Sequence, residues 1–152
     1  MGSLQFQYFK QHRKEKAVRK HLGKFQTELN EDQKKAIMCS LFHLANGDGE
    51  YHDKEHEFIV QTSELLGYAL PSSGRRMAAE FMQMDKSEFF DQLNTLNEAQ
   101  KDWFLITTYG MIHSDNKALE EEFNILKVYF GYMNVSMEHF EKVIQESDVF
   151  ES

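Results

Sequence analysis

The stretch Asn46-Gly47-Asp48-Gly49-Glu50-Tyr51-His52-Asp53-Lys54-Glu55 separates two runs of residues with helical periodicity. Its glycines allow positive φ angles, so a helix that enters the stretch ends there. Its later acids suit the first turn of a new helix, where free N–H groups and the helix dipole favour carboxylates. The stretch therefore predicts two helices joined by an acidic turn.

The residues on both sides of this turn complete a helical hairpin over residues 30–67. Asn30 followed by Gln33 is typical of a capping box at the start of the first helix. Apolar residues then recur along one helical face, at Ile37, Leu41, Leu44 and Ala45. The second helix is expected to begin near Asp53 and to close at Gly67, which suits the left-handed C′ position.

The same pattern returns at a fixed offset, over residues 97–134. Asn97 and Gln100 repeat the cap, and Ser114-Asp115-Asn116 repeats the turn. Asn134 stands where Gly67 stood, and Asn is the other residue that tolerates the left-handed conformation. We therefore expect an internal repeat of two hairpins, residues 30–67 and 97–134.

The remaining segments also favour helices. Residues around 77–82 and the residues after Asp85 predict two short helices, and Ser136 suits the cap of a final one. The sequence has no segment with the alternation of a β-strand. The expected fold is an all-α single helical domain of about seven to eight helices, built on a duplicated helical hairpin.

The composition favours a globular protein of a reducing compartment. Of the 152 residues, 41% are hydrophobic, which suffices for a core without disulfides. Cys39 is the single cysteine and lies within a predicted helix without a neighbouring base, so we expect a buried, unreactive thiol. No apolar run approaches the roughly 18 residues of a membrane span, and the expected location is cytoplasmic.

Charge is distributed unevenly along the chain. Residues 1–24 hold seven Lys and Arg against Glu15 alone, a net charge of +6, whereas the whole chain carries −8 and the remainder therefore −14. Apolar residues among these cations predict a helix over residues 4–22. This arm either packs on the body with its cations beside acidic neighbours, or makes peripheral contact with anionic lipid. The −14 of the body argues against nucleic acid as a partner.

The two acidic turns hold more carboxylates than helix capping requires. Residues 48–57 carry a local charge of −4, and residues 115–122 carry −3. Carboxylates that converge from two turns suit a hard divalent cation, with Ca²⁺ or Mg²⁺ a better fit than Zn²⁺. The same acids suit a protein partner with a basic surface, and a solvated acidic face is the simpler alternative.

The first turn partly matches two known metal-site motifs, the EF-hand loop and a zinc-hydrolase pattern. In an EF-hand register with Gly49 at the sixth position, the first ligand position falls on Leu44, which cannot bind Ca²⁺. His52, Glu55 and His56 fit the H-x-x-E-H pattern of zinc hydrolases. The pattern is short and has no counterpart in the second turn, so a non-enzymatic protein is expected. The sequence has no phosphate loop, nucleophile elbow or dinucleotide fingerprint.

The turn Asn46-Gly47-Asp48-Gly49, with Tyr51 two residues on and Glu55 four residues later, resembles the signature of the TerB-like tellurite-resistance family. Its echo at Ser114-Asp115-Asn116 with Glu122 resembles the same signature, and the resemblance covers roughly residues 30–146. It implies a basic N-terminal helical arm at residues 1–25 added to a TerB-like helical domain at residues 26–152.

The resemblance also implies a function and a site. Members are all-helical, pseudo-duplicated cytoplasmic bacterial domains linked to tellurite and related stress responses, without an established enzymatic activity. Their acids have been viewed as a metal-binding cluster, and the matching positions are Asp48, Glu55, Asp115 and Glu122. Asn116 replaces the usual Gly, and His52 and Leu119 replace the usual helix caps, so the second turn departs further from the family pattern.

Overall fold

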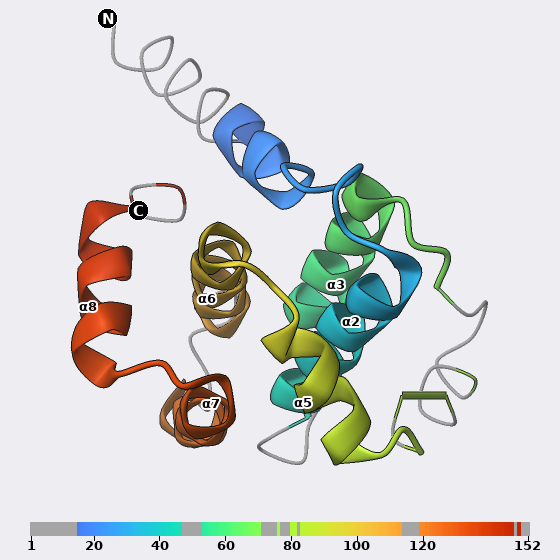
Figure 1. The fold of residues 1–152 in the computed structure, drawn as a ribbon. Helices are drawn as coiled ribbons and strands as arrows, with labels where there is room; N and C mark the ends of the chain where they lie inside the picture. The colour runs from blue at the N-terminus through green and yellow to red at the C-terminus, as the bar shows by residue number, and fades with distance from the viewer. Residues whose placement is uncertain are drawn as a thin grey trace, which may run out of the picture.

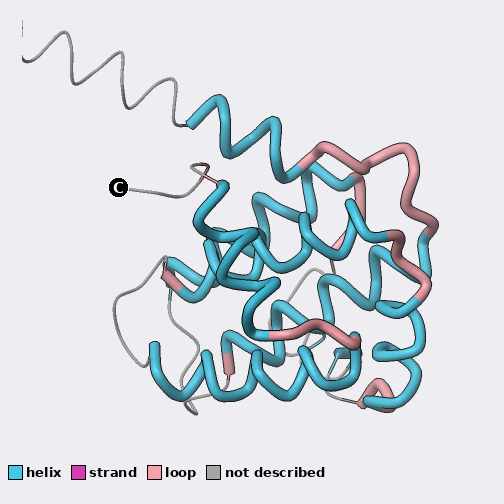
Figure 2. The backbone as a smooth tube through the Cα atoms, turned by 60° about the vertical axis from the view of Figure 1, so that its left-hand side comes forward, coloured by secondary structure: helices cyan, strands magenta, loops and turns pink. Residues whose placement is uncertain are grey.

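The computed structural model contains helices and loops and no strand over the residues it describes, as Figures 1 and 2 show. The described residues are 15–46, 53–70, 76, 80–81, 83–113, 119–147 and 149. One helix covers residues 15–22, and six further helices have complete bounds: α2 (Glu31–Ala45), α3 (Asp53–Leu66), α5 (Lys86–Asn94), α6 (Glu98–Ile112), α7 (Leu119–Met133) and α8 (Met137–Glu146). The predicted all-α fold is confirmed.

Some predicted segments lie outside the described residues. The predicted helix over residues 4–22 is described only from residue 15 onward, and most of the short helix around 77–82 is not described. Both acidic turns fall outside as well, at residues 47–52 and 114–118. The arrangement of the helices on either side of them is described.

The first helix of each hairpin lies in the centre of the fold. α2 contacts α3, α5, α6 and α7, and α6 contacts α2, α3, α7 and α8. The buried residues of α2 are Lys34, Ala36, Ile37, Met38, Cys39, Ser40, Leu41, Phe42, Leu44 and Ala45. The single apolar face predicted for this helix is therefore too narrow, because neighbouring helices cover α2 from several sides.

Both predicted capping boxes are present, with the same geometry. Asn30 Oδ1 accepts from the Gln33 N–H at 2.8 Å, and Asn97 Oδ1 accepts from the Gln100 N–H at 2.8 Å. Each glutamine side chain accepts in return from the N–H of its asparagine at 3.0 Å. These bonds satisfy backbone donors that the starts of α2 and α6 would otherwise leave free.

The ends of α3 and α7 match in the same way. Gly67 has φ +71° and Asn134 has φ +57°, so the predicted left-handed caps are confirmed. The following residue donates its N–H to the carbonyl five positions earlier at 2.9 Å in both hairpins, from Tyr68 to Ser63 and from Val135 to Phe130. This bond is typical of a Schellman motif. The interpretation of the hairpins as two copies of one unit stays a prediction, which these paired bonds support.

The shorter helices begin where the sequence predicts. Asp85 accepts from the Ser87 N–H at 3.0 Å at the start of α5. Ser136 Oγ accepts from the His139 N–H at 3.0 Å at the start of α8. α5 packs on α2 and α7, and α8 packs on α6, so each covers a central helix.

The segment after the helix over residues 15–22 enters the core. Leu22, Phe25 and Leu29 are buried in the same cluster as the apolar residues of α2 and α6. Gly23 lies so close to α3 that a Cβ at this position would stand 3.2 Å from the Leu65 carbonyl oxygen. The division of the chain at residue 25 stays a prediction, and residues on both sides of it share one core.

Trp103 of α6 holds this segment in place. Its Nε1–H donates to the His21 carbonyl at 2.6 Å, and its ring stacks on the His21 imidazole with centroids 5.9 Å apart. His21 Nε2 lies 2.9 Å from the Thr107 hydroxyl one turn further along α6. Burial, and then the charge of Lys24, lower the pKa of His21 to about 4, so the imidazole is neutral at neutral pH.

Two further predictions concern Cys39 and membrane crossing. The Cys39 side chain is fully buried, and burial raises the pKa of its thiol to about 12, as expected for an unreactive cysteine. Within the described part of the chain, no helix is both long and apolar enough to cross a membrane.

Candidate functional site

Two of the four predicted site residues lie in described helices, and both are buried. Glu55 is in the first turn of α3 and Glu122 is in the first turn of α7. Each side chain is only 1% exposed. Near-complete burial is rare for glutamate, and these two glutamates occupy matching positions in the two hairpins.

The helices that carry these glutamates share their neighbours. α2 contacts both α3 and α7, and α6 also contacts both. Figure 1 shows α2 and α3 on one side of the molecule and α6, α7 and α8 on the other. Glu55 and Glu122 therefore lie at the starts of two helices that pack against the same central pair, α2 and α6.

Burial of a carboxylate demands compensation. Transfer of an ionised carboxylate from water into an apolar environment is costly unless hydrogen bonds, a cation or protonation offset the cost. The start of a helix supplies backbone N–H groups and the positive end of the dipole. Acids at the first turn of α3 and α7 were predicted from this principle, but the principle holds equally for exposed acids and does not require burial.

The other two predicted site residues, Asp48 and Asp115, lie outside the described residues. Among the residues that the structure does describe, no three His, Cys, Asp or Glu side chains are grouped closely enough to hold a metal ion. The donor set is made of carboxylates, which suits a hard cation such as Ca²⁺ or Mg²⁺. A site at these positions would thus need the aspartates of the turns to join the buried glutamates.

The zinc-hydrolase pattern meets a mismatch in burial. His52 lies outside the described residues, whereas Glu55 is buried and His56 is exposed. In such a site, the general base and the histidine ligands face the same metal-bound water. Glu55 and His56 lie in different environments, which does not suit that geometry.

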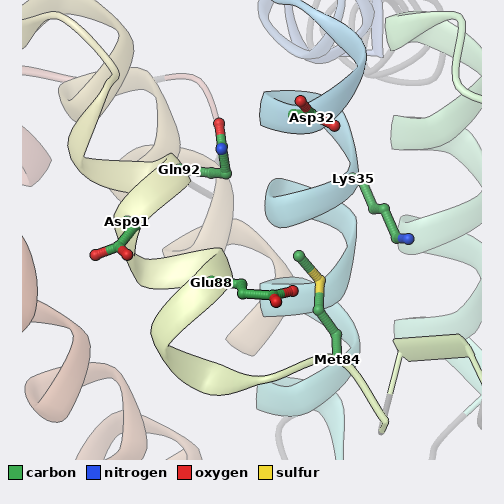
Figure 3. Close-up of a pocket in the computed structure, with 6 residues that line it drawn as sticks. All are labelled: Asp32, Lys35, Met84, Glu88, Asp91 and Gln92. Atoms are coloured by element: carbon green, nitrogen blue, oxygen red, sulfur yellow. The ribbon is translucent and has the colours of Figure 1, made fainter.

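A second acidic feature lies on the surface between α2 and α5. This groove has a volume of about 310 Å³ and is lined by Asp32, Lys35, Met84, Glu88, Asp91 and Gln92. Figure 3 shows that its carboxylates do not converge, because Glu88 extends toward α2 whereas Asp91 points away from it. Lys35 Nζ lies 4.0 Å from a carboxylate oxygen of Glu80. The groove has acidic character without the geometry of a cation site.

The structure also pairs two residues that the sequence did not connect. His139 Nε2 lies 2.7 Å from Asp102 Oδ1, and both side chains are partly exposed. They line a polar pocket of about 510 Å³ between the start of α6 and the connection from α7 to α8. The pair joins α6 to α8 over a long sequence separation, so no local spacing could have revealed it.

Comparisons with known proteins give one match. Residues 6–78 match the family model described as "Tellurite resistance protein TerB". The match begins inside the basic arm and ends after α3, so it includes Asp48 and Glu55 and leaves the second hairpin outside. No curated protein and no solved structure gave a match.

Proposed function

We propose that the chain is a TerB-like, non-enzymatic domain with a tellurite-resistance or stress-related role; the match of residues 6–78 to the TerB family model supports this. In this proposal, the two acidic turns bind a divalent cation through Asp48 and Glu55 in the first hairpin and Asp115 and Glu122 in the second. Ca²⁺ or Mg²⁺ fits these oxygen donors better than Zn²⁺ does.

The paired burial of Glu55 and Glu122 carries the proposal. Each is 1% exposed, and each follows the aspartate of its own turn by the same number of residues. A surface rich in acids for solubility alone would keep its carboxylates in water. A cation beside both glutamates would offset part of the cost of removing them from water, and the turn aspartates would complete an oxygen-rich ligand set.

A protein partner with a basic surface is the second candidate. Beside the buried glutamates, Glu57 of α3 and Glu120 and Glu121 of α7 remain exposed. These exposed acids, together with the acidic groove between α2 and α5, would attract a partner protein whose surface is positively charged. Binding of this kind would weaken as salt rises and would persist in the presence of a chelator.

Thermal unfolding in the presence of Ca²⁺, Mg²⁺, Mn²⁺ or Zn²⁺ tests the cation proposal. A ligand that binds only the folded state stabilises it by about 2.7 kcal/mol at a hundredfold excess over its Kd. We expect Ca²⁺ or Mg²⁺ to raise the Tm of the wild-type protein, and Asp48→Asn combined with Asp115→Asn to abolish the increase. The metal-induced change in Tm is compared, since each substitution also alters the stability of the metal-free protein.

Matched controls separate a specific site from general charge. Glu55→Gln and Glu57→Gln remove the same charge from α3, but only Glu55 is buried. Glu122→Gln and Glu121→Gln form the same contrast in α7. Loss of the metal response only in the Glu55 and Glu122 variants supports the site. An absent response in the wild type, or an equal response in all four variants, contradicts it and leaves the basic partner as the better candidate.

A further inference from the structure

The helix over residues 15–22 has two faces of opposite character. His21 and Leu22 face the body, where Leu22 is fully buried and the His21 backbone accepts from Trp103. Lys16, Arg19 and Lys20 are exposed, and their spacing of three and four residues places them on one face. The apolar and hydrogen-bonded side thus anchors the helix, and a basic stripe of Lys16, Arg19 and Lys20 faces solvent.

Among the described residues, the cations of this stripe and those of α2 differ in their acidic neighbours. Over the described residues, no carboxylate lies within 4.0 Å of Lys16, Arg19, Lys20 or the nearby Lys24. By contrast, Lys34 and Lys35 of α2 each have an acidic neighbour. The end of the helix does pack on the body, and the expectation that the arm lays its cations along acidic neighbours stays a prediction.

The position of the stripe limits what can bind it. Figure 1 shows the helix at one end of the molecule, beyond the end of α3. Its anchoring through Gly23 and Trp103 holds it in one orientation relative to the core. For a partner that meets the molecule at this end, screening at physiological salt, with a Debye length of about 8 Å, weakens repulsion from the more distant acids of the body.

The sequence before the stripe favours a lipid surface among anionic partners. Residues 1–14 add Lys10, Arg13 and Lys14, and they interleave these cations with the apolar side chains of Leu4, Phe6, Tyr8 and Phe9. Four to eight basic residues together with aromatic and aliphatic ones are typical of segments that bind the interface of an anionic membrane. Binding to a phosphate backbone would use the cations and would leave the aliphatic residues without a role.

We propose that the basic stripe of Lys16, Arg19 and Lys20, with the segment that precedes it, binds the surface of a membrane containing anionic lipid. The anchored helix then orients the body on the membrane, so that the acidic helix starts of α3 and α7 are presented in a defined direction. This proposal does not depend on cation binding at those helix starts.

Co-sedimentation of the full chain with vesicles tests the proposal. The wild type should bind vesicles of mixed phosphatidylglycerol and phosphatidylcholine, and should not bind vesicles of phosphatidylcholine alone. Each Lys or Arg near an anionic membrane contributes about fivefold to binding, so Lys16→Gln/Arg19→Gln/Lys20→Gln should weaken it on the order of a hundredfold. Binding by the wild type should also fall steeply as salt increases.

A charge-matched variant provides the control. Lys86→Gln/Lys127→Gln/Lys142→Gln removes three exposed cations from α5, α7 and α8, and should retain nearly all vesicle binding. Equal loss in both triple variants would overturn the proposal, because net charge would then explain the binding. Circular dichroism spectra and a Tm like those of the wild type would show that both variants remain folded.

Two parallel measurements on the same variants, of oligonucleotide binding and of self-association, distinguish other partners. Binding to a single-stranded oligonucleotide without binding to anionic vesicles would overturn the proposal in favour of nucleic acid. Self-association that requires the stripe and is unaffected by vesicles would overturn it in favour of a second copy of the chain. Vesicle binding that depends on anionic lipid and on the stripe, with neither alternative observed, would support it.

Discussion

The hairpins α2–α3 and α6–α7 begin and end with the same hydrogen bonds and backbone conformations, but they differ in the side chains that they bury. Their capping boxes agree in both hydrogen bonds, and both close with a left-handed residue. Near the start of the first helix, however, Ala36 of α2 corresponds to Trp103 of α6, and both are buried. Local hydrogen bonds thus define the hairpin, whereas the side chain at this position decides what packs against it.

The difference has a structural consequence at the N-terminal segment. Trp103 reaches across to the His21 carbonyl and packs edge-on against Phe25 at a centroid distance of 5.9 Å. An alanine, as at position 36, could make neither contact. The second hairpin therefore holds the segment that follows the helix over residues 15–22, and the two hairpins serve different roles in one core.

The largest loss of stability is expected when Trp103 is replaced by alanine, the residue at the matching position 36 of the first hairpin. Trp103→Ala should lower the free energy of unfolding by about 3–5 kcal/mol, because it removes a large buried ring. Trp103→Phe should lower the free energy of unfolding less, because it keeps a buried aromatic ring, although it also loses the bond to the His21 carbonyl. Urea denaturation measures both variants. Similar losses for the two would contradict the importance of ring packing.

The stability of the protein at mildly acidic pH should depend on the protonation of His21. Burial keeps this imidazole neutral in the folded protein down to a pKa of about 4, whereas in the unfolded chain it protonates below pH 6.5. The unfolded state therefore binds more protons between these values, and stability should fall as pH decreases through this window. When the unfolded state binds one proton more than the folded state, the free energy of unfolding changes by about 1.4 kcal/mol per pH unit.

The His21→Gln variant isolates this effect. Burial also lowers the pKa values of His43 and His113, so the wild-type curve contains contributions of the same sign from them. The difference between the wild-type and His21→Gln curves, measured by urea denaturation at several pH values, should decrease as the pH falls. A constant difference would show that His21 does not couple protonation to folding.

Substitutions at the two left-handed caps should differ in their effect on stability. Gly67→Ala should cost about 1–2 kcal/mol, because a residue with a Cβ is strained at φ +71°. Asn134→Gly should be neutral or stabilising by less than about 1 kcal/mol, since glycine adopts the same conformation without strain. Chemical denaturation of both variants tests this contrast, and a stabilising Gly67→Ala would contradict it.

The smallest effects are expected at the capping boxes, where the hairpins agree most closely. Asn30→Ala and Asn97→Ala should each cost about 1 kcal/mol, because each removes one acceptor for a helix N-terminal donor. Asn→Asp at either position should cost little, since aspartate is an equally good cap. A clear difference between the two alanine variants would show that the tertiary context of the caps, such as the bond from Gln33 Nε2 to Thr95, matters.

What could be predicted from the sequence is what depends on nearby residues. The caps at Asn30 and Asn97 and the closures at Gly67 and Asn134 follow from interactions within a few positions, and the structure confirms them. The burial of α2 on several sides could not be predicted from its own periodicity. It depends on which other helices pack against it.

The candidate site shows the same division. The placement of Glu55 and Glu122 in first turns follows from local acid patterns, but their 1% exposure depends on the packing of α3 and α7 against α2 and α6. The contact between Trp103 and His21 and the pair of His139 with Asp102 join distant segments, and no spacing in the sequence indicates them.

Trp103 is also the only tryptophan of the chain, which gives the protein a built-in spectroscopic probe. Its indole ring is almost completely shielded from water and stacks on an imidazole of the N-terminal segment. Detachment of that segment would expose the indole and shift its emission to longer wavelength while the helical content stayed nearly constant. Intrinsic fluorescence therefore reports whether the N-terminal helix is docked, without any added label.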